Sequence, residues 1–411
     1  MPASRFVAKM FSVALVILSL AFAAMAQSDI DTLKRQAGLG DAWAQFSLGL
    51  AYYQGHGVPQ DYAQAAAWYR KAAEQGNVKA QTGLGWMYDQ GQGMPPDDAQ
   101  AAIWWRKAAD QGDSYAQYSL GNLYLQGHGV PQDATQTVVW WRKAAEQGDA
   151  QAQDSLGALY VQGSQGVPPD DAQAVVWWRK AAEQGDADAQ YNLGVAYDLG
   201  HGAPQDSAQA VVWYRKAADQ GSAVAQYSLG LAYALGHGVP QDSAQAVAWY
   251  RKAADQGNAD AQYNLGVAYD LGQGVPKDPA QAIAWYRKAA DQGNAVAQYN
   301  LGLVYALGHG VPQDYTQGAT WFRKAADQGN ADAQLYLGNA YQFGHGVPKD
   351  NTEAYFWYAL AASGKPERVA QADVNKWRNQ AASRLTPAKL ALARARVKKW
   401  IADHSAQSAT Q

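Results

Sequence analysis

The chain has 411 residues, of which 48% are apolar, so it can bury one large core or several smaller ones. Its formal charge of −3 provides no overall positive field, which argues against a nucleic-acid partner. It contains no cysteine, which excludes a disulfide framework, thiolate zinc sites and cysteine nucleophiles.

The first segment in chain order has the pattern of a secretory signal. Arg5 and Lys9 form a basic start, an apolar run follows at 10–23, and the Ala-Met-Ala at 24–26 fits the site read by signal peptidase. The run is too short to span a membrane comfortably. We therefore expect residues 1–26 to be removed, which leaves an exported chain without a transmembrane anchor. The expected location is a bacterial periplasm, with secretion as the alternative. An uncleaved anchor is the other interpretation of the segment.

An internal repeat of 36 residues organises the rest of the chain. The segment Asp41–Gly76 recurs eight times, with a single step of 37 residues where Ser164-Gln165 replaces one loop residue. An insertion in a loop disturbs packing least. The later copies begin at Asn77, Asp113, Asp149, Asp186, Ser222, Asn258, Asn294 and Asn330.

Each copy contains two helical patterns. In the first copy Ala44, Leu48 and Tyr52 stand four residues apart and mark one face of a first helix. A second helix begins near Asp61 and ends before Gly76, which is suited to a C-terminal cap. The sequence thus predicts one helix-turn-helix unit per copy.

We call each set of nine equivalent positions a column and number it by its residue in the first copy. Column 49 is glycine in every copy, although glycine inside a helix costs about 1 kcal/mol relative to alanine. We therefore expect another helix to approach closely there. Alanines at 72 and 73 suit the same tight crossing, while Trp68 and Tyr69 supply bulk.

One helix pair of this kind cannot bury its apolar face, but stacked pairs can. The sequence predicts an all-α fold, an α/α superhelical solenoid of nine 36-residue repeats at 41–364 with terminal capping helices. The stretch ADAQYNLGVAYDLGHGAPQDSAQAVVWYRKAADQGS, which begins at Ala187, resembles the Sel1-like repeat, a relative of the tetratricopeptide repeat. The resemblance implies a solenoid that binds other proteins, often in bacterial envelope or signalling pathways. It also implies a concave groove lined by the first helices.

The ends of the array differ from its middle. Residues 27–40 are expected to form a capping half-unit before the first repeat. In the ninth copy Ala359 and Leu360 replace the Arg-Lys pair that the other copies carry. These apolar residues need a cover, and the segment 365–404 is expected to supply it.

We expect this segment to form two basic capping helices. The first is predicted at 366–383, and the second starts at Thr386-Pro387 and runs to about Ala402. Residues 405–411 should form a disordered tail. The excess of basic residues fits solvated capping helices or contact with an anionic partner, such as a cell-wall polymer. The basic residues are Lys365, Arg368, Lys376, Arg378, Arg384, Lys389, Arg394, Arg396, Lys398 and Lys399.

Six of the seven histidines stand in one loop slot, within variants of the stretch LGHGVPQD. Metal ligands must converge on one ion, but equivalent loops in stacked repeats lie about 10 Å apart. The slot is also occupied by Gln92 and Gln273, and no catalytic motif such as G-x-S-x-G or H-E-x-x-H is present. We therefore predict no catalytic site, no metal site and no cofactor. The stretch is interpreted as a helix end, a turn and a helix start.

Partner binding is expected on a second stripe of the first helix, formed by columns 43, 46, 50 and 53. These columns vary widely in chemistry between copies, which packing would not permit, so the stripe is predicted to be exposed. Column 46 is mostly tyrosine, which suits contact with a peptide or protein. The alternative is that these rings fill space between adjacent first helices. The candidate binding residues are Trp43, Phe46, Leu50, Tyr53, Trp86, Asp89, Tyr118, Asn122, Tyr191, Asp198, Tyr227, Tyr263, Asp270 and Tyr299.

The sequence thus predicts a non-enzymatic periplasmic scaffold. It would bind a protein or an extended peptide in its groove and so assemble or regulate cell-envelope machinery. Two alternatives remain open. One is a protein that binds or hydrolyses peptidoglycan, and the other is a secreted factor that acts on a host.

Overall fold

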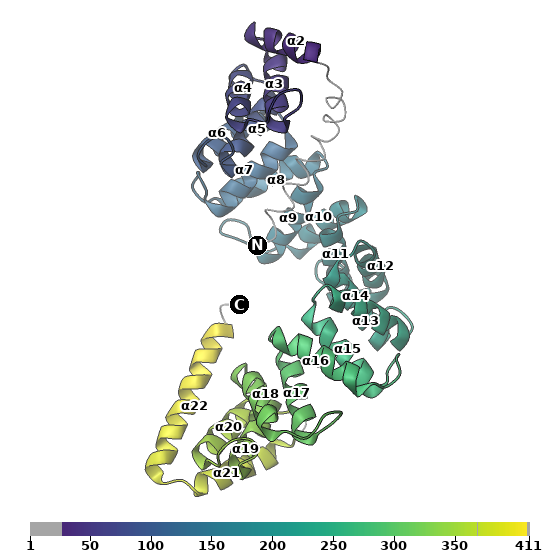
Figure 1. Cartoon of the computed structure of the whole chain (residues 1–411), viewed down its shortest axis with the longest axis vertical. Coiled ribbons are helices and arrows are strands. Elements are labelled where there is room, and N and C mark those ends of the chain that lie inside the picture. The colour runs from purple at the N-terminus through teal and green to yellow at the C-terminus, as the bar shows by residue number, and fades with distance from the viewer. Residues whose placement is uncertain (1–26, 368, 409–411) are drawn as a thin grey trace. The chain divides into compact units, whose positions relative to one another are not determined.

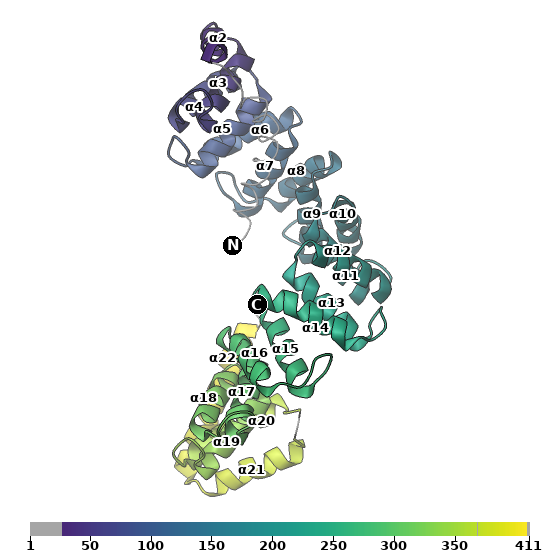
Figure 2. The same ribbon diagram turned by 45° about the vertical axis from the view of Figure 1, so that its right-hand side comes forward.

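The computed structural model describes residues 27–367 and 369–408, so the expected signal at 1–26 lies outside the described part. These residues form 21 helices, α2 to α22, and no strand, apart from an isolated antiparallel bridge between Ser164 and Val167. The fold is an all-α solenoid, as predicted, in which helix pairs follow one another along the chain (Figures 1 and 2). Within the described ranges, no helix is both long enough and apolar enough to cross a membrane.

Each repeat consists of a first and a second helix joined by a loop. The first helices are α3 (Ala42–Gln54), α5 (Val78–Gln90), α7 (Ser114–Gln126), α9 (Ala150–Gln162), α11 (Ala187–Leu199), α13 (Ala223–Leu235), α15 (Ala259–Leu271), α17 (Ala295–Leu307) and α19 (Ala331–Phe343). The second helices are α4 (Tyr62–Glu74), α6 (Asp98–Asp110), α8 (Ala134–Glu146), α10 (Asp171–Glu183), α12 (Ser207–Asp219), α14 (Ser243–Asp255), α16 (Pro279–Asp291), α18 (Tyr315–Asp327) and α20 (Asn351–Gly364). The chain divides into two compact units, which meet in sequence between Gln205 and Asp206.

Short polar and glycine residues set the helix ends, as the sequence predicted. The side chain of Asp41 caps α3, and Gly55 ends that helix in the left-handed conformation at φ 75°. Asp61 then caps α4, where its Oδ1 accepts the N–H of Gln64 at 2.9 Å. Gly76, at φ 89°, follows the last turn of α4. The stretch LGHGVPQD is therefore a helix end, a turn and a helix start.

The second glycine of this loop has a further role, which is to let neighbouring repeats dock. Gly93 has φ 74°, and a Cβ there would lie 2.4 Å from the backbone carbonyl of Tyr62, in the first turn of the preceding second helix. Gly238 stands in the same relation to Ser207, at 2.1 Å. Only glycine fits, because both the backbone angle and the space exclude a side chain.

The prediction of a close helix crossing at column 49 is confirmed. The ring of column 69 lies against the glycine, so that a Cβ on Gly85 would be 2.5 Å from Trp105 and one on Gly266 would be 2.6 Å from Tyr286. The destabilising glycine is thus offset by the burial of a large aromatic ring, since Trp105 is only 3% exposed.

A buried glutamine in column 45 links each repeat to the one before it. Gln81 is 3% exposed, and its Nε2 donates to the carbonyl oxygen of Ala73, near the end of the preceding second helix, at 3.0 Å. Its Oε1 accepts from Nε2 of Gln111, which follows the second helix of its own repeat, at 2.7 Å. The same pair of hydrogen bonds is found in both compact units of the chain, for example at Gln298 in the second. Each buried amide is therefore satisfied by two different second helices.

The Arg-Lys pair of the first eight second helices has two separate uses. Arg142 donates to the hydroxyl of Tyr160 in the next repeat at 2.8 Å. Lys143 lies over the ring of Trp140 in its own helix, with Nζ 4.0 Å from the ring centroid. The arginine thus joins neighbouring repeats, while the lysine covers an indole face.

Both ends of the array are covered by additional helices. At the start, α2 (Gln27–Gly38) packs on α3 through a cluster that includes Ile30, Leu33 and Ala37. At the other end, α21 (Gln371–Ser383) and α22 (Pro387–Ser408) pack against α20 (Figure 1). The predicted cover of Ala359 and Leu360 is confirmed, because these side chains are 7% and 2% exposed.

The predicted limits of the two C-terminal helices are wrong in two places. Helix α21 begins at Gln371 and not at Pro366, because Lys365 adopts the left-handed conformation at φ 55° and ends α20 with a change of chain direction. Helix α22 continues to Ser408, so the expected disordered tail does not begin at 405. The ring of His404 stacks on Trp400 with centroids 3.5 Å apart and contacts the carbonyl of Asp327, which holds this end against the repeats.

We predict that Gln298→Ala lowers the free energy of unfolding by about 2 kcal/mol, because it leaves the Ala290 carbonyl and the Gln328 amide without their buried partner. Urea unfolding followed by circular dichroism measures the change. The control is Gln317→Ala, at an exposed glutamine of α18, which should stay within about 0.5 kcal/mol of the parent. Equal effects of the two substitutions would contradict a special role for the buried glutamine.

Candidate functional site

The predicted stripe on the first helices is only partly exposed. Phe46, Leu50, Trp86 and Tyr299 are 7%, 1%, 7% and 2% exposed, so the prediction that they lie on an open surface is wrong. Phe46, Leu50 and Trp86 belong to one core cluster, against which Tyr53 packs. The physical reason is ring packing. Phe46 stacks on Tyr69 of its own second helix, and Tyr299 packs against Phe322 of its own second helix and Tyr336 of the next first helix.

Column 46 shows this packing most clearly. Tyr118, half-buried, stacks on Trp141 of its own second helix at 5.9 Å, and its hydroxyl lies 3.3 Å from Ser155 Oγ in the next first helix. Asn300 Nδ2 likewise donates to Tyr263 Oη at 3.4 Å. The rings of this column thus pack on their own second helices, and their hydroxyls reach the first helix of the next repeat. The half-buried members are Tyr118, Tyr191, Tyr227 and Tyr263.

Other predicted residues keep an open surface. Trp43 is 57% exposed and lies 5.5 Å from the ring of Phe46. Tyr53 is half-buried and meets the ring of Trp86 at 5.8 Å. In columns 50 and 53 the partly exposed candidates are Asp89, Asn122, Asp198 and Asp270.

The most exposed apolar column was not among the predicted binding positions. Column 54 is the last residue of each first helix and is glutamine in the first four copies, but leucine or phenylalanine in the last five. In the second unit these side chains form what we call the leucine row. Its members are Leu235, Leu271, Leu307 and Phe343, with exposures of 63%, 58%, 68% and 58%. The change from glutamine to leucine along the sequence was the available signal.

Three hollows lie beside the leucine row, each between successive first helices of the second unit. We number the repeats one to nine. Hollow 6/7 has a volume of about 330 Å³ and is bordered by Leu235 and Val267, while hollow 7/8, of about 430 Å³, is bordered by Val267, Leu271 and Leu307. Hollow 8/9, of about 380 Å³, is bordered by Leu307 and Phe343. Because Val267 and Leu307 are each shared by two hollows, the three form one continuous surface.

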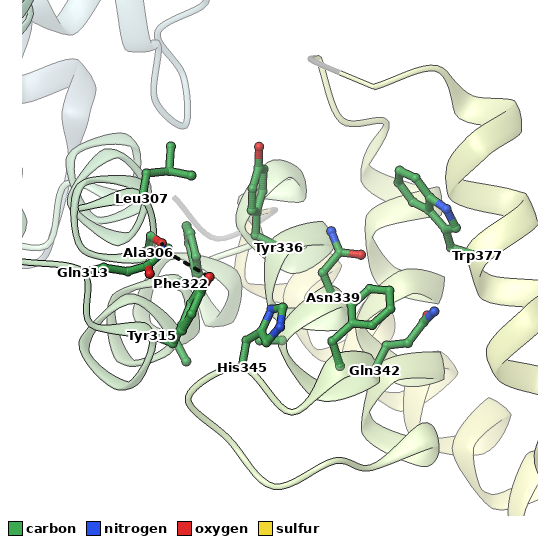
Figure 3. A pocket seen from close by; sticks show the side chains of 13 residues that line it. Ala306, Leu307, Gln313, Tyr315, Phe322, Tyr336, Asn339, Gln342, His345 and Trp377 are labelled. Carbon is green, nitrogen blue, oxygen red and sulfur yellow. Dashed lines mark hydrogen bonds between the residues drawn. The ribbon is translucent and has the colours of Figure 1, made fainter. Parts of the chain in front are cut away.

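Hollow 8/9 differs from the others in its aromatic lining (Figure 3). Leu307 and Tyr315 lie on one side and Trp377 of the C-terminal cap on the other, with Asn339 and His345 between them. The ring of His345 stacks on Tyr315 at 4.7 Å. The cap helix α21 thus contributes directly to this part of the surface.

The charged groups of the surface are concentrated in hollow 7/8. Asp270 and Lys277 border this hollow, and His309 Nε2 lies 3.4 Å from Asp270 Oδ1. No lysine or arginine occurs in any of the helices α13, α15, α17 and α19. The first helices of this unit therefore present carboxylates and neutral groups.

Contacts with the preceding repeat are made by His128, His309 and His345. His128 Nδ1 lies 4.0 Å from Asp98 Oδ2, and five of the six loop histidines are exposed, while His56 is half-buried. Within the part of the chain that the structure describes, no three His, Asp or Glu side chains are grouped to hold a metal ion.

One half-buried carboxyl interrupts the tyrosines of column 46. Asp154 takes the place of a ring between repeats four and five. Its burial, together with the nearby carboxylate of Asp186, raises the pKa of Asp154 to about 7, although Asn192 Nδ2 donates to it at 3.2 Å and opposes the change. The folded chain therefore favours the protonated acid at this position.

Comparison with known proteins agrees with this geometry. The Sel1 repeat family pattern matches nine consecutive segments, at 44–77, 78–113, 114–149, 150–186, 187–222, 223–258, 259–294, 295–330 and 331–365. The chain belongs to the Sel1 repeat family.

Two solved Sel1-type structures are similar over most of the chain. One is a protective antigen present in uropathogenic Escherichia coli strains, with 35% identity, a TM-score of 0.55, and coverage of 92% of this chain and 95% of that one. The other is a Sel1 repeat protein from Oxalobacter formigenes, with 38% identity, a TM-score of 0.63, and coverage of 76% and 89%. No curated protein matches the chain at a significant level. Sel1 repeat solenoids are in general scaffolds for protein–protein interaction.

We predict that Asp154→Asn makes this Sel1 repeat protein more resistant to unfolding at pH 8 than the parent, by more than about 1 kcal/mol. The raised pKa means that the folded state holds a proton that the unfolded state loses above its ordinary value of 3.8. The parent therefore loses stability as pH rises from about 4 towards 7, and asparagine does not.

Urea unfolding at pH 4.5 and pH 8 measures this difference. Asp198→Asn, at a half-exposed carboxylate of α11, is the control and should show little change with pH relative to the parent. The same gain in stability from Asp154→Asn at both pH values would contradict a raised pKa of Asp154 in the folded state.

Proposed function

We propose that the chain is a non-enzymatic scaffold of the bacterial cell envelope that binds an extended segment of a partner protein along the leucine row. The observation that carries the proposal is the row itself. Four large apolar side chains, more than half exposed, border a continuous series of hollows on one face of the second unit. An exposed apolar surface of this kind is typical of an interaction site.

The first four repeats support this assignment by contrast, while Leu199 of α11, also in the first unit, already carries leucine at this position and is 57% exposed. Column 54 is glutamine in α3, α5, α7 and α9, and these helices cap and pack as the others do. The fold therefore accepts a polar residue at this position. Leucine in the second unit is not required for packing, which favours a role in binding.

The basic C-terminal helix supports a second candidate partner. On α22 the exposed residues include Lys389, Arg394, Lys398 and Lys399, of which Lys399 pairs with Asp403 at 2.8 Å. Such a surface suits an anionic polymer, including those of the cell wall. Wall binding at the cap is compatible with protein binding at the leucine row, because the two surfaces use different residues.

Export of the chain is also a proposal. It is supported by the basic start, apolar run and small-residue site within residues 1–26. The related Escherichia coli protein is a protective antigen, and this favours a location that is reached by the immune system. The signal-like segment supports a periplasmic location, and secretion is the alternative.

We predict that Leu271→Gln with Leu307→Gln abolishes capture of a partner protein from an envelope extract. Two exposed leucines that become buried on binding contribute roughly 1.5–3 kcal/mol each, so their loss should lower affinity more than tenfold. Immobilised parent and variant are compared by mass spectrometry of the bound proteins.

Val212→Gln is the matched control, since Val212 is 49% exposed on a second helix of the same unit. It should capture the same partner as the parent. Equal capture by the double variant would contradict the leucine row, and retention by purified cell wall without any protein partner would favour the polymer-binding alternative.

We predict that the protein recovered from the periplasm begins at Gln27, as intact mass would show. Ala26→Leu should block processing, because signal peptidase requires a small residue at this position. A parent chain that keeps residues 1–26 and remains in the cytoplasm would contradict export.

A further inference from the structure

We propose that the contact between repeats four and five is a pH-dependent junction, which is closed in acidic solution and loosens as the solution becomes neutral. We call this contact, between α9 and α11, junction 4/5. It uses no residue of the leucine row, so the inference goes beyond the proposed function and does not depend on it. Three observations support it: a carboxyl group in place of a ring, reduced aromatic packing, and two further carboxylates without a cation.

The polar contact of junction 4/5 has an acceptor that can ionise. Elsewhere in the array a neutral tyrosine hydroxyl joins successive first helices, as where Asn300 Nδ2 donates to Tyr263 Oη at 3.4 Å. At junction 4/5 Asp154 takes the place of the tyrosine, and Asn192 Nδ2 of the next first helix donates to its Oδ1 at 3.2 Å. The contact between repeats is therefore kept, but the group that accepts it can become charged.

The aromatic packing at junction 4/5 is reduced compared with a junction that has a tyrosine. Tyr118 stacks on Trp141 with ring centroids 5.9 Å apart, whereas Asp154 offers no ring to Trp178. Trp141 Nε1 donates to the carbonyl oxygen of Tyr118 at 3.1 Å. The buried Nε1 of Trp178 has no acceptor within hydrogen-bonding distance in the described part of the chain. Junction 4/5 therefore depends more strongly on its polar contact than the others do.

Ionisation of Asp154 brings like charges together across the junction. Asp186 caps α11 and Asp188 lies in its first turn, and both act on Asp154 from the far side of the junction. Tyr118 of α7 is a further titratable group beside it, and among the described residues no lysine or arginine acts on Asp154. The arginines of α8 and α10 instead donate to tyrosine hydroxyls. Repulsion across junction 4/5 therefore begins when the acid loses its proton.

The direction of the pH effect follows from these contacts. Burial and the carboxylate of Asp186 raise the pKa of Asp154 from 3.8 to about 7, although the side chains of Asn192 and Trp178 act in the opposite direction. In an open junction the exposed carboxyl returns to its ordinary pKa of 3.8. Opening thus releases a proton, so the open fraction should rise by up to about tenfold per pH unit between about 4 and 7 and then level off.

Hydrogen exchange followed by mass spectrometry tests the proposal on the purified full chain. Helices of 13 residues are marginal without tertiary packing, so loosening of junction 4/5 should raise the exchange of α9 and α11. After correction for the intrinsic pH dependence of exchange, we expect their protection to fall at least about tenfold between pH 5 and pH 7. Helices α15 and α17, joined by the neutral contact of Tyr263 with Asn300, are the internal reference and should keep their protection. Global unfolding would instead affect all four helices, and a uniform change or no change would overturn the proposal.

Four variants assign the effect to one side chain. Asp154→Asn keeps an acceptor for Asn192 but cannot ionise, and Asp154→Tyr restores the usual residue of the column. Both should keep at pH 7 the protection that they have at pH 5. Asp188→Asn removes one neighbouring charge without touching the cap of α11, and should make the fall in protection smaller. Asp198→Asn, at a half-exposed carboxylate of α11, should leave the fall unchanged.

Two further outcomes would overturn the proposal. One is a fall in protection that persists in both Asp154→Asn and Asp154→Tyr, since the titrating group would then lie elsewhere. The other is a loss of the pH dependence in Asp198→Asn as complete as in Asp154→Asn, which would mean that the general charge of α11 is responsible. Circular dichroism at pH 5 verifies that each variant is folded, and the two substitutions at Asp154 keep the test valid if one of them does not fold.

Discussion

The buried glutamine of each first helix is the contact on which the stacking of the repeats depends. The carbonyl of Ala73, near the end of α4, accepts the backbone N–H of Gly76 and also the side-chain amide of Gln81 in the next repeat. The amide of Gln81 supplies one donor to the preceding repeat and one acceptor to its own repeat. One side chain therefore satisfies groups of two second helices and fixes the register between them. The tyrosine rings, the Arg–Tyr bonds and the exposed column 54 are positioned by this register.

Much of the fold follows from the sequence because the repeat states each local rule nine times. Asp61 as a cap, Gly76 after the last turn and Gly49 beneath an aromatic ring are all consequences of steric and hydrogen-bonding rules that act within one repeat. The cover of Leu360 by the C-terminal helices could also be predicted, because an apolar residue replaced a charged one. The end of α22 could not, since it depends on a contact between His404 and a distant helix.

The candidate site was harder to predict, because variation in a column was taken as exposure. Leu50 and Trp86 differ in type, yet both are buried in one core cluster. The column of greatest apolar exposure varies little within each half of the array and changes once, from glutamine to leucine. Burial of these side chains depends on their distance to the first helix of the next repeat. The sequence of one repeat alone does not specify that distance. A change of class along a column was more informative here than its overall variability.

The docking of each loop glycine on the preceding second helix has a consequence for how such arrays lengthen. Gly93 and Gly238 leave no space for a side chain, so each boundary between repeats is the same pair of complementary surfaces. In the one irregular loop the extra residue is accommodated between Gly163 and Gly166 and closed by the Ser164–Val167 bridge, and a Cβ on Gly166 would meet the side chain of Thr135 in the preceding second helix at 2.8 Å. Loss or duplication of a whole repeat rejoins matching surfaces, whereas a partial change does not. The binding surface can therefore grow or shrink in steps of one hollow without any redesign of the interior.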